Sequence, residues 1–513
     1  MSEGNNNKNT NQSLDGLTQE TLKGLFWMFS GTGIQFILRL LVLIVLARLL
    51  TPQDFGLVGA AMVIVSFSEI FSQLGVGPAI VQRSQLKKTH LCVAFFISII
   101  SGLILAGLVF ILAPYIASFF RMEKLVLILK IFSMVFVIKG FSAVSEALLQ
   151  RELKFKWLAT VQVISYALGF GVVGVTMGFM EYGVWALVAA YLTQEFVKSS
   201  TILISKPHSK RPMFDVIALK ELMYFGSGFT IARISNQLAL QGDNLVVGRW
   251  LGESALGVYS RAYQMMTMPA TLFGQVLDKV LFPVMAKVQD DLGRLTSVYK
   301  RGVALIALIT APISAIMFIL APEITLLLLG PQWDEAVLPF QILATAIWFR
   351  TSYKISDSIA RATGAVYRRA WRQVIYAFCI IGGSWIGSYW GIAGVAFGVL
   401  CALFVNFILM AQLSISLTLL TWKSFFRVHF SAAFLTIVVS IIVYTVVAMS
   451  RVLLLPDIGV VLLAILIFIT SIITVFFISP VLLLGEEGLW IFRTLLSYVP
   501  AKIGSKVNRW VNL

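Results

Sequence analysis

The sequence predicts an all-α polytopic membrane protein with about fourteen transmembrane helices, and three observations support this fold class. Hydrophobic residues make up 58% of the 513 residues and charged residues only 12%, whereas soluble proteins carry about 25% charged residues. Apolar stretches of about 20 residues, the length that crosses a bilayer as a helix, recur along the chain. None of them alternates polar and apolar residues as barrel strands do, so helices are the expected spanning form.

The expected spans divide into two sets of equal size and a final pair. The first set covers 24–48, 55–80, 91–119, 125–149, 158–180 and 183–204. The second set covers 222–242, 256–284, 299–320, 336–360, 371–389 and 392–417, and the pair covers 428–449 and 458–484. We expect two pseudo-symmetric lobes, 22–204 and 222–418, around a central cavity.

Three segments outside the spans differ from them in composition. Residues 1–21 are rich in Asn and Ser and have no apolar signal segment, which predicts a disordered cytoplasmic tail. Residues 205–221 and 485–513 mix basic residues with apolar and aromatic ones, and we expect both to lie on the cytoplasmic face of the bilayer. The alternative for these two is a solvated linker and tail.

An internal echo supports duplication. With one constant offset, 47–58 aligns with 248–259, so that Arg48 matches Arg249 and Gly56 matches Gly257. The stretch that begins Y-G-V-W at 182 likewise resembles the stretch that begins W-G-I-A at 390. Duplicated transporter halves show weak self-similarity of this kind, although Leu- and Gly-rich membrane helices can also align by chance.

The distribution of basic residues predicts the orientation. Alternate connections between spans are strongly basic: Arg83, Lys87, Lys88; Arg151, Lys154, Lys156; Lys206, Lys210, Arg211, Lys220; Lys287, Arg294, Lys300, Arg301; Arg361, Arg368, Arg369, Arg372; Lys423, Arg427. The connections between these carry few basic residues. By the positive-inside rule the basic set is cytoplasmic, as are both termini. The net charge of +16 then needs no nucleic-acid partner to explain it.

No motif points to catalysis or to a cofactor. The chain has no phosphate-binding loop for ATP, and its three cysteines lie far apart, without metal or disulfide spacing. No histidine is paired with a nucleophile. We therefore predict no catalytic residue, no metal and no cofactor.

Polar and charged side chains within the apolar spans are the candidates for a substrate site. A charge at the bilayer centre costs about 2.5–3.5 kcal/mol, so it marks a cavity or a partner. These residues recur at steps of three and four, which place them on one face of a helix. The candidates are Gln35, Arg39, Glu69, Gln73, Lys139, Arg233, Gln237, Gln241, Arg350 and Lys354. A cavity with such basic walls suits an anionic or phosphate-bearing substrate.

Local pairing is the alternative to cavity lining. Lys354 would then pair with Asp357, Lys139 with Glu146, and Glu195 with Lys198 near the inner surface. Arg361 would extend its side chain to that surface.

Several motifs resemble those of a known family. A-R-L-L-T-P-Q-D-F-G-L at 47–57 and L-G-V-G-P-A-I-V-Q-R at 74–83 are similar to the first helix hairpin of the Wzx-type polysaccharide exporters. Q-G-D-N-L-V-V-G-R-W-L-G at 241–252 and L-G-V-Y-S-R-A-Y-Q at 256–264 are similar to the second half. The resemblance is strongest to the colanic-acid and teichuronic-acid exporter branch of the multidrug/oligosaccharidyl-lipid/polysaccharide flippase superfamily.

The resemblance implies a V-shaped fold and a task. The protein would move an undecaprenyl-pyrophosphate-linked sugar repeat from the cytoplasmic to the outer leaflet of the bacterial inner membrane by alternating access. A polysaccharide polymerase or export complex would be a partner. Ion-gradient coupling is implied as well, with Glu69, Glu146 and Asp357 as candidates for it.

Three other functions stay open. The first is a lipid II flippase of peptidoglycan synthesis, which growth rescue of a strain lacking that flippase would favour. The second is a multidrug or cation antiporter, which the basic stripe suits poorly. The third is a membrane glycosyltransferase or polymerase, which sugar transfer by the pure protein would favour.

Overall fold

The computed structural model describes residues 33, 35–72, 76–83, 86–208, 215 and 236–478 of the chain. Across these ranges the regular structure is helical and no strand occurs, which confirms the all-α class. Eight stretches in the described part are long and apolar enough to cross a membrane, the longest of them, Val366–Ser416, containing two successive helices. The chain is therefore a multi-pass membrane protein, while the full number of spans stays a prediction.

Most of the described helices overlap the predicted spans, but the helical run at 236–250 extends beyond the span predicted over 222–242, and α13 lies between two predicted spans. Helical runs occupy 35–49 and 236–250. The other elements of the first half are α2 (Pro52–Ser72), α3 (Val76–Gln82), α4 (Lys88–Phe120), α5 (Leu125–Phe132), α6 (Met134–Arg151), α7 (Phe155–Tyr166), the π-helical η1 (Ala167–Gly174), α8 (Val175–Phe179) and α9 (Val184–Ser205). Those of the second half are α11 (Gly252–Lys287), α12 (Leu292–Ile319), α13 (Ala321–Leu328), η2 (Pro331–Ala336), α14 (Val337–Ala362), α15 (Val366–Gly387), η3 (Ser388–Trp390), α16 (Gly391–Ser416), α17 (Trp422–Val452) and α18 (Asp457–Ile478).

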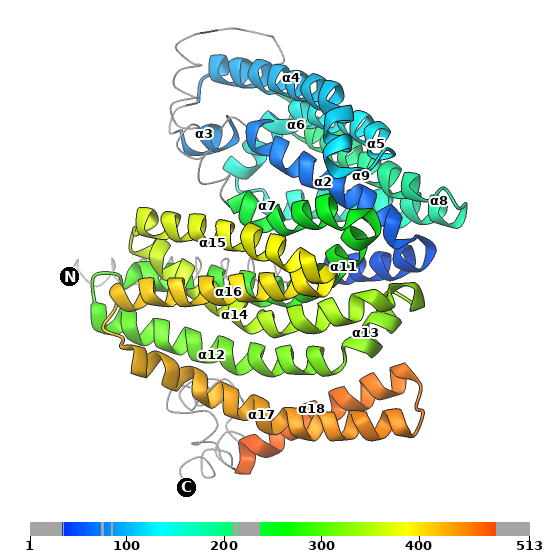
Figure 1. Ribbon diagram of the computed structural model, residues 1–513. Helices are drawn as coiled ribbons and strands as arrows, with labels where there is room; N and C mark the ends of the chain where they lie inside the picture. The colour runs from blue at the N-terminus through cyan, green and yellow to red at the C-terminus, as the bar shows by residue number, and fades with distance from the viewer. Residues whose placement is uncertain are drawn as a thin grey trace, which may run out of the picture. The chain divides into compact units, whose positions relative to one another are not determined.

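The contacts divide the chain into two compact units. Unit 1 comprises residues 1–51, 64–118 and 123–231, and unit 2 comprises 52–63, 119–122 and 232–513. In unit 1, α9 packs against α6, α7 and η1. In unit 2, α14 packs against α11, α12 and α16, α15 packs against α16, and α17 packs against α12 and α18 (Figure 1).

One hydrophobic cluster of unit 2 joins helix ends next to connections that the sequence analysis assigns to the cytoplasmic side of the membrane. Its buried members include Leu295 at the start of α12, Ile359 near the end of α14, and Leu420 and Phe425 around the α16–α17 turn. The backbone N–H of Leu419 also donates to the Thr296 hydroxyl at 3.0 Å. This grouping agrees with the alternation of basic and non-basic connections.

The two copies of the echoed motif meet within unit 2. A Cβ atom added to Gly56 of α2 would overlap the backbone carbonyl of Glu253, and one added to Gly257 of α11 would overlap that of Pro52. Each glycine thus packs on the carbonyl four residues before the other glycine, as a local two-fold relation requires. Backbones approach this closely only where side chains are absent. The Gln53 amide donates to the Glu253 carboxylate at the same crossing.

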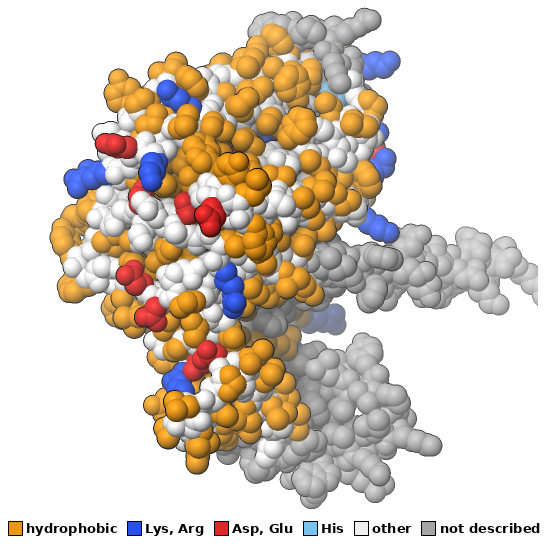
Figure 2. Space-filling model, turned by 90° about the vertical axis from the view of Figure 1, so that its right-hand side faces the viewer, with side chains coloured by type: hydrophobic (Ala, Val, Ile, Leu, Met, Phe, Trp, Pro, Cys, Tyr) orange, Lys and Arg blue, Asp and Glu red, His pale blue; other side chains and the backbone are white. Residues whose placement is uncertain are grey.

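The surface matches a bilayer environment. Hydrophobic side chains cover most of the face seen in Figure 2, with few charged groups between them. Large apolar side chains are widely exposed, among them Ile111 (69%), Phe378 (72%) and Phe430 (71%). Exposed apolar surface on this scale is unfavourable in water, and it is the surface that lipid covers.

The expectations for 1–21, 209–214, 216–221 and 485–513 concern residues outside the described part. The lobe boundaries of the sequence analysis stay predictions.

Candidate functional site

Eight of the ten predicted substrate-site residues lie within the described ranges, and Gln73 and Arg233 lie outside them. Gln35, Arg39, Glu69 and Lys139 belong to unit 1, while Gln237, Gln241, Arg350 and Lys354 belong to unit 2. The geometry within each unit shows which of these side chains come together.

In unit 1, Lys139 of α6 lies between two carboxylates from other helices. Its ammonium group forms an ion pair and hydrogen bond with Glu69 of α2 and lies 3.6 Å from Oε2 of Glu195 on α9. The ring of Tyr191, one turn before Glu195, lies 6.0 Å from the same nitrogen. The Glu195 side chain is 7% exposed, against 32% for Glu69. Two carboxylates and one ammonium give this group a net charge of −1.

The neighbouring polar groups of α6 and α9 pair with each other. Lys198 lies 3.4 Å from Glu146, and the hydroxyls of Ser142 and Ser199 are 3.0 Å apart. The local pairings expected for Lys139 with Glu146 and for Glu195 with Lys198 are therefore wrong. Both followed from sequence proximity, and packing of α6 on α9 brings more distant residues together instead.

Arg39 and Gln35 do not join the Lys139 group. The Arg39 side chain is exposed, and its guanidinium lies 5.6 Å from the centre of the Tyr166 ring. The buried side-chain nitrogen of Gln35 has no hydrogen-bond partner among the described residues.

In unit 2, Arg350 of α14 is a buried guanidinium held by aromatic groups. It is 7% exposed, donates to the Tyr263 hydroxyl at 2.8 Å, and lies 5.4 Å from the centre of that ring. Its Nε is buried and has no hydrogen-bond partner, and within the described ranges no carboxylate forms an ion pair with it. Arg350 thus retains donor capacity that the described residues do not use.

Asp243 is a buried residue near Arg350 that the sequence analysis did not select as a candidate. It is fully buried, and its carboxylate accepts from the Tyr259 hydroxyl at 2.7 Å and from the backbone N–H of Asn244 at 2.8 Å. Arg350 attracts this carboxylate electrostatically. The available signal was a carboxylate at the end of a predicted membrane helix. The tyrosines gave none, because they count as apolar in a hydrophobicity pattern.

The C-terminal part of α14 carries a second group of charged side chains. Asp357 pairs with Arg361 at 3.2 Å and also with Arg369 of α15. The expected Lys354–Asp357 pair is therefore wrong. Lys354 instead extends over Gly274 of α11, where an added Cβ atom would come within 2.8 Å of its ammonium nitrogen.

Gln237 and Gln241 lie four residues apart in the helical run 236–250, as expected for one stripe. The Asn244 amide donates to Gln241 at 2.9 Å. The polar stripe is thus partly satisfied along its own helix.

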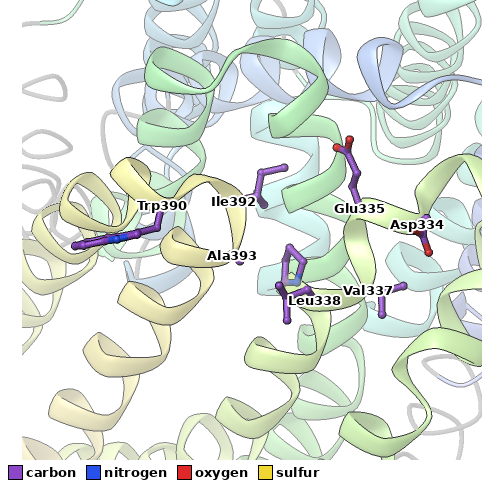
Figure 3. Close-up of a pocket in the computed structure, with 8 residues that line it drawn as sticks. Asp334, Glu335, Val337, Leu338, Trp390, Ile392 and Ala393 are labelled. Carbon is purple, nitrogen blue, oxygen red and sulfur yellow. The ribbon is translucent and has the colours of Figure 1, made fainter.

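A pocket of about 470 Å³ lies at the other end of α14, lined by Asp334, Glu335, Val337, Leu338, Pro339, Trp390, Ile392 and Ala393. Figure 3 shows the acidic residues reaching it from η2 and Trp390 from the turn before α16. No predicted site residue lines this pocket, and its charged groups are acidic. It is therefore a poor match for a phosphate group.

Metal chemistry has no visible support in this part of the molecule. In the part of the chain that the structure describes, no group of three or more His, Cys, Asp or Glu side chains is placed to hold a metal ion. The cationic groups described above can bind or release an anion.

Comparison with known proteins gives the family. The sequence matches the family described as "Polysaccharide biosynthesis protein" over residues 45–338, which is more than half of the chain. It is 25% identical over 353 residues to the teichuronic acid biosynthesis protein TuaB of Bacillus subtilis (strain 168), covering 68% of this chain and 72% of that protein. It is also 25% identical over 396 residues to the lipopolysaccharide biosynthesis protein WzxC of Escherichia coli (strain K12), covering 77% and 80%. The succinoglycan biosynthesis transport protein ExoT of Rhizobium meliloti (strain 1021) is 25% identical over 389 residues, covering 70% and 78%.

Solved structures give the fold. The lipid II flippase MurJ in an inward closed conformation matches with a TM-score of 0.72 at 15% identity, covering 88% of this chain and 98% of that chain. An inward-facing multidrug resistance MATE family transporter of the MOP superfamily matches with a TM-score of 0.60 at 17% identity, covering 75% and 94%. At these identities the likeness concerns the fold and not the substrate. By sequence, the chain belongs to the polysaccharide biosynthesis protein family, as a Wzx-type membrane transporter with the MOP superfamily fold and not as an enzyme.

Proposed function

We propose that this protein flips undecaprenyl-pyrophosphate-linked sugar repeat units from the cytoplasmic to the outer leaflet by alternating access. The observation that carries the proposal is Arg350: a buried guanidinium with an unused Nε donor and no carboxylate in ion-pair range among the described residues. A buried cation is costly unless something anionic neutralises it. In a family of polysaccharide transporters, the pyrophosphate of a lipid-linked glycan is an anion of the right kind.

The chemistry of such a substrate matches the side chains in both units. Arginine binds phosphate oxygens through paired N–H donors, which favours Arg350 for the pyrophosphate group. Gln35, Gln237 and Gln241 supply amide groups that can hydrogen-bond sugar hydroxyls. The lipid tail can stay in the bilayer, so only the polar head needs a protected path. Arg39, Lys139, Lys354 and Arg233 are the further basic candidates that the sequence predicts for binding the anionic head group.

The distribution of charge supports an orientation with both termini in the cytoplasm of a bacterial inner membrane. The turns at 152–154, 288–291, 363–365 and 417–421 are flanked by the basic residues that the positive-inside rule assigns to the cytoplasm. The membrane potential then assists export, because moving one negative charge outward gains about 2.3 kcal/mol per 100 mV. A polysaccharide polymerase or export complex would take the product on the outer side.

Coupling to an ion gradient would add to this driving force, with Glu69, Glu146 and Asp357 as the candidate groups. Glu146 and Asp357 have cationic partners, Lys198 for the first and Arg361 and Arg369 for the second. Glu69 shares the Lys139 ammonium group with Glu195.

The test is deletion of the gene followed by extraction of lipid-linked intermediates. We expect complete repeat units on undecaprenyl pyrophosphate to accumulate on the inner leaflet, and polymer to disappear. Intermediates that stop short of a complete repeat unit would instead indicate a transferase. Rescue of a strain lacking its lipid II flippase would assign the protein to peptidoglycan synthesis.

A further inference from the structure

In unit 1 two carboxylates, Glu69 and Glu195, approach the same ammonium group of Lys139. Glu195 is 6% exposed, and its Oε2 atom has no hydrogen-bond partner, although it lies 3.6 Å from the Lys139 nitrogen. Glu69 already provides Lys139 with an ion pair and a hydrogen bond. A buried carboxylate oxygen without a donor normally needs an explanation.

We propose that Glu195 is a proton-binding residue, and that its protonation strengthens the binding of an anionic substrate at Lys139. With Glu195 ionised, the three groups carry a net charge of −1 and repel an anion. A proton on Glu195 forms a neutral carboxylic acid, brings the net charge to zero and leaves Lys139 with one anionic partner instead of two. The substrate part of this inference rests on the proposed function.

Among the residues that the structure describes, no second cation forms an ion pair with Glu195. The titratable groups that face it are Lys139 on α6, Glu69 on α2 and Tyr191 on its own helix. Lys198, the next cation along α9, is engaged by Glu146. Among the other elements packed on α9, η1 and α8 contain no titratable residue, and Lys130 of α5 lies 5.0 Å from the centre of the Phe110 ring. On α7, Lys156 is exposed at the first turn, and Tyr166 at the last lies under Arg39.

Close packing holds the group in place. The Ser142–Ser199 hydrogen bond fixes α6 against α9 one turn beyond Lys139 and Glu195. A Cβ atom added to Gly169 of η1 would come within 2.8 Å of the Gln194 backbone nitrogen, and one added to Gly140 would come within 2.8 Å of the Ser98 carbonyl oxygen. Because helix backbones approach on both sides, Lys139 and Glu195 have little freedom to move apart.

Unit 2 shows the contrast. Steps of 211 residues relate Lys139 to Arg350 and Glu146 to Asp357 on the corresponding helices α6 and α14. Arg350 contacts a tyrosine, as Lys139 does, but no described carboxylate forms an ion pair with it. The two units thus place a cation beside a tyrosine at matching positions, and in the described part of unit 1 a pair of carboxylates approaches that cation. We infer that the affinity of unit 1 for an anion depends on protons.

The first experiment tests the proton site without substrate. The full-length protein in lipid nanodiscs is titrated from pH 8 to pH 4 by infrared difference spectroscopy, which detects the carbonyl band of a protonated carboxylic acid. We expect a titrating band that is absent in Glu195→Gln and kept, at a shifted midpoint, in Glu195→Asp. Glu181→Gln, at an exposed turn of the same unit, is the matched control and should leave the band unchanged. An unchanged band in Glu195→Gln would overturn the proposal.

The second experiment tests the linkage, with undecaprenyl pyrophosphate as the probe. We expect wild-type affinity to rise about tenfold from pH 8 to pH 5, the size expected for removing one nearby charge, and Glu195→Gln to bind tightly at both pH values. Sodium replacing potassium at constant pH should have no effect, and a sodium dependence that Glu195→Gln abolishes would overturn a proton in favour of sodium. If the infrared band behaves as expected but the probe does not bind, the proton site stands and the proposed substrate is wrong.

Discussion

The Lys139 ammonium and the Arg350 guanidinium both lie beside a tyrosine ring, and they differ in their other partners. Lys139 has Glu69 and Glu195, whereas Arg350 has the Tyr263 hydroxyl. The sequence predicted both cations because a charge within an apolar stretch stands out. It could not predict the partners, since Glu69 and Lys139 are 70 residues apart and Tyr263 and Arg350 are 87 apart. Pairing over such separations depends on which helices touch.

Replacing Arg350 tests its proposed role. We expect Arg350→Lys to reduce polymer export about tenfold or more, because an ammonium group cannot donate in pairs to a phosphate, and Arg350→Ala to reduce it further. Export is measured as polymer per amount of membrane-inserted protein. Arg368→Lys, at an exposed arginine bonded to Ser416, is the control and should export normally. Export at the wild-type level by Arg350→Lys would show that Arg350 does not bind the substrate through paired donors.

The Glu152 carboxylate at the end of α6 gives a prediction for pH. Hydrogen bonds from Lys206 and then Lys154 hold the pKa of Glu152 below its usual range. A lowered pKa contributes stability that is present above the unfolded-state value and is lost as pH falls through the folded-state value. Glu152→Gln should therefore lower the thermal midpoint slightly at pH 7, and the difference from wild type should shrink as the pH falls through the folded-state pKa of Glu152. A difference that persists in acid would show that these bonds do not depend on charge.

At the scale of helices, the motif repeated at 47–58 and 248–259 forms a close contact between two helices, which the repeat in the sequence did not reveal. The sequence located the glycines but could not show that the two copies touch each other. The structure crosses α2 and α11 at Gly56 and Gly257, backbone against backbone. Other local features were also beyond a hydrophobicity pattern, such as the π-helical turn at Ala167–Gly174 within the span predicted over 158–180.

Adding one methyl group at the crossing should separate the two helices. We expect Gly56→Ala and Gly257→Ala each to cost about 1–3 kcal/mol or more, because the added atom meets backbone, which cannot rotate away. Gly107→Ala on α4 is the control: nothing lies within 4 Å of its added Cβ, so it should be neutral or stabilising by about 0.4–1 kcal/mol. Thermal unfolding in detergent measures all three. Equal midpoints for Gly56→Ala and Gly107→Ala would show that the crossing is looser than described.

The Glu323–Arg451 pair fixes α17 to α13. Arg451 donates to both oxygens of the buried Glu323, at 2.7 and 3.0 Å. Since the Arg451 side chain is 40% exposed, water can partly replace its lost partner, and Glu323→Gln should cost about 1–3 kcal/mol. A double-mutant cycle with Arg451→Gln gives the coupling energy. Additive effects of the two single changes would exclude a contribution from the pair.

For the whole molecule, the sequence was sufficient for the all-α class and for the approximate position of most described helices. Bilayer thickness sets the length of each apolar stretch, so its position in the sequence is nearly its position in the structure. The candidate site was only partly predictable, because Glu195, Asp243 and the tyrosines act through contacts between helices. Composition cannot distinguish a buried tyrosine that holds Arg350 from one that merely fills space.

The orientation of the whole chain can be tested by labelling. In a variant without Cys92, Cys379 and Cys401, a cysteine at Met180 should react with a membrane-impermeant thiol reagent on intact cells. A cysteine at Lys154 should react only after the membrane is opened, because the positive-inside rule places that turn in the cytoplasm. Both positions are exposed. The reverse pattern would invert the topology and, with it, the direction of transport.

The glycine crossing limits how far the two halves of this chain can diverge. At most helix contacts, a substitution that changes the size of a side chain can be compensated by a smaller or larger side chain on the neighbouring helix. At Gly56 and Gly257 there is no side chain to trim, and each position faces the main chain beside the other. A larger residue at either position would separate the two helices, whichever copy carries it. A pair of glycines at this spacing can therefore be used to search for related transporters built from two such halves.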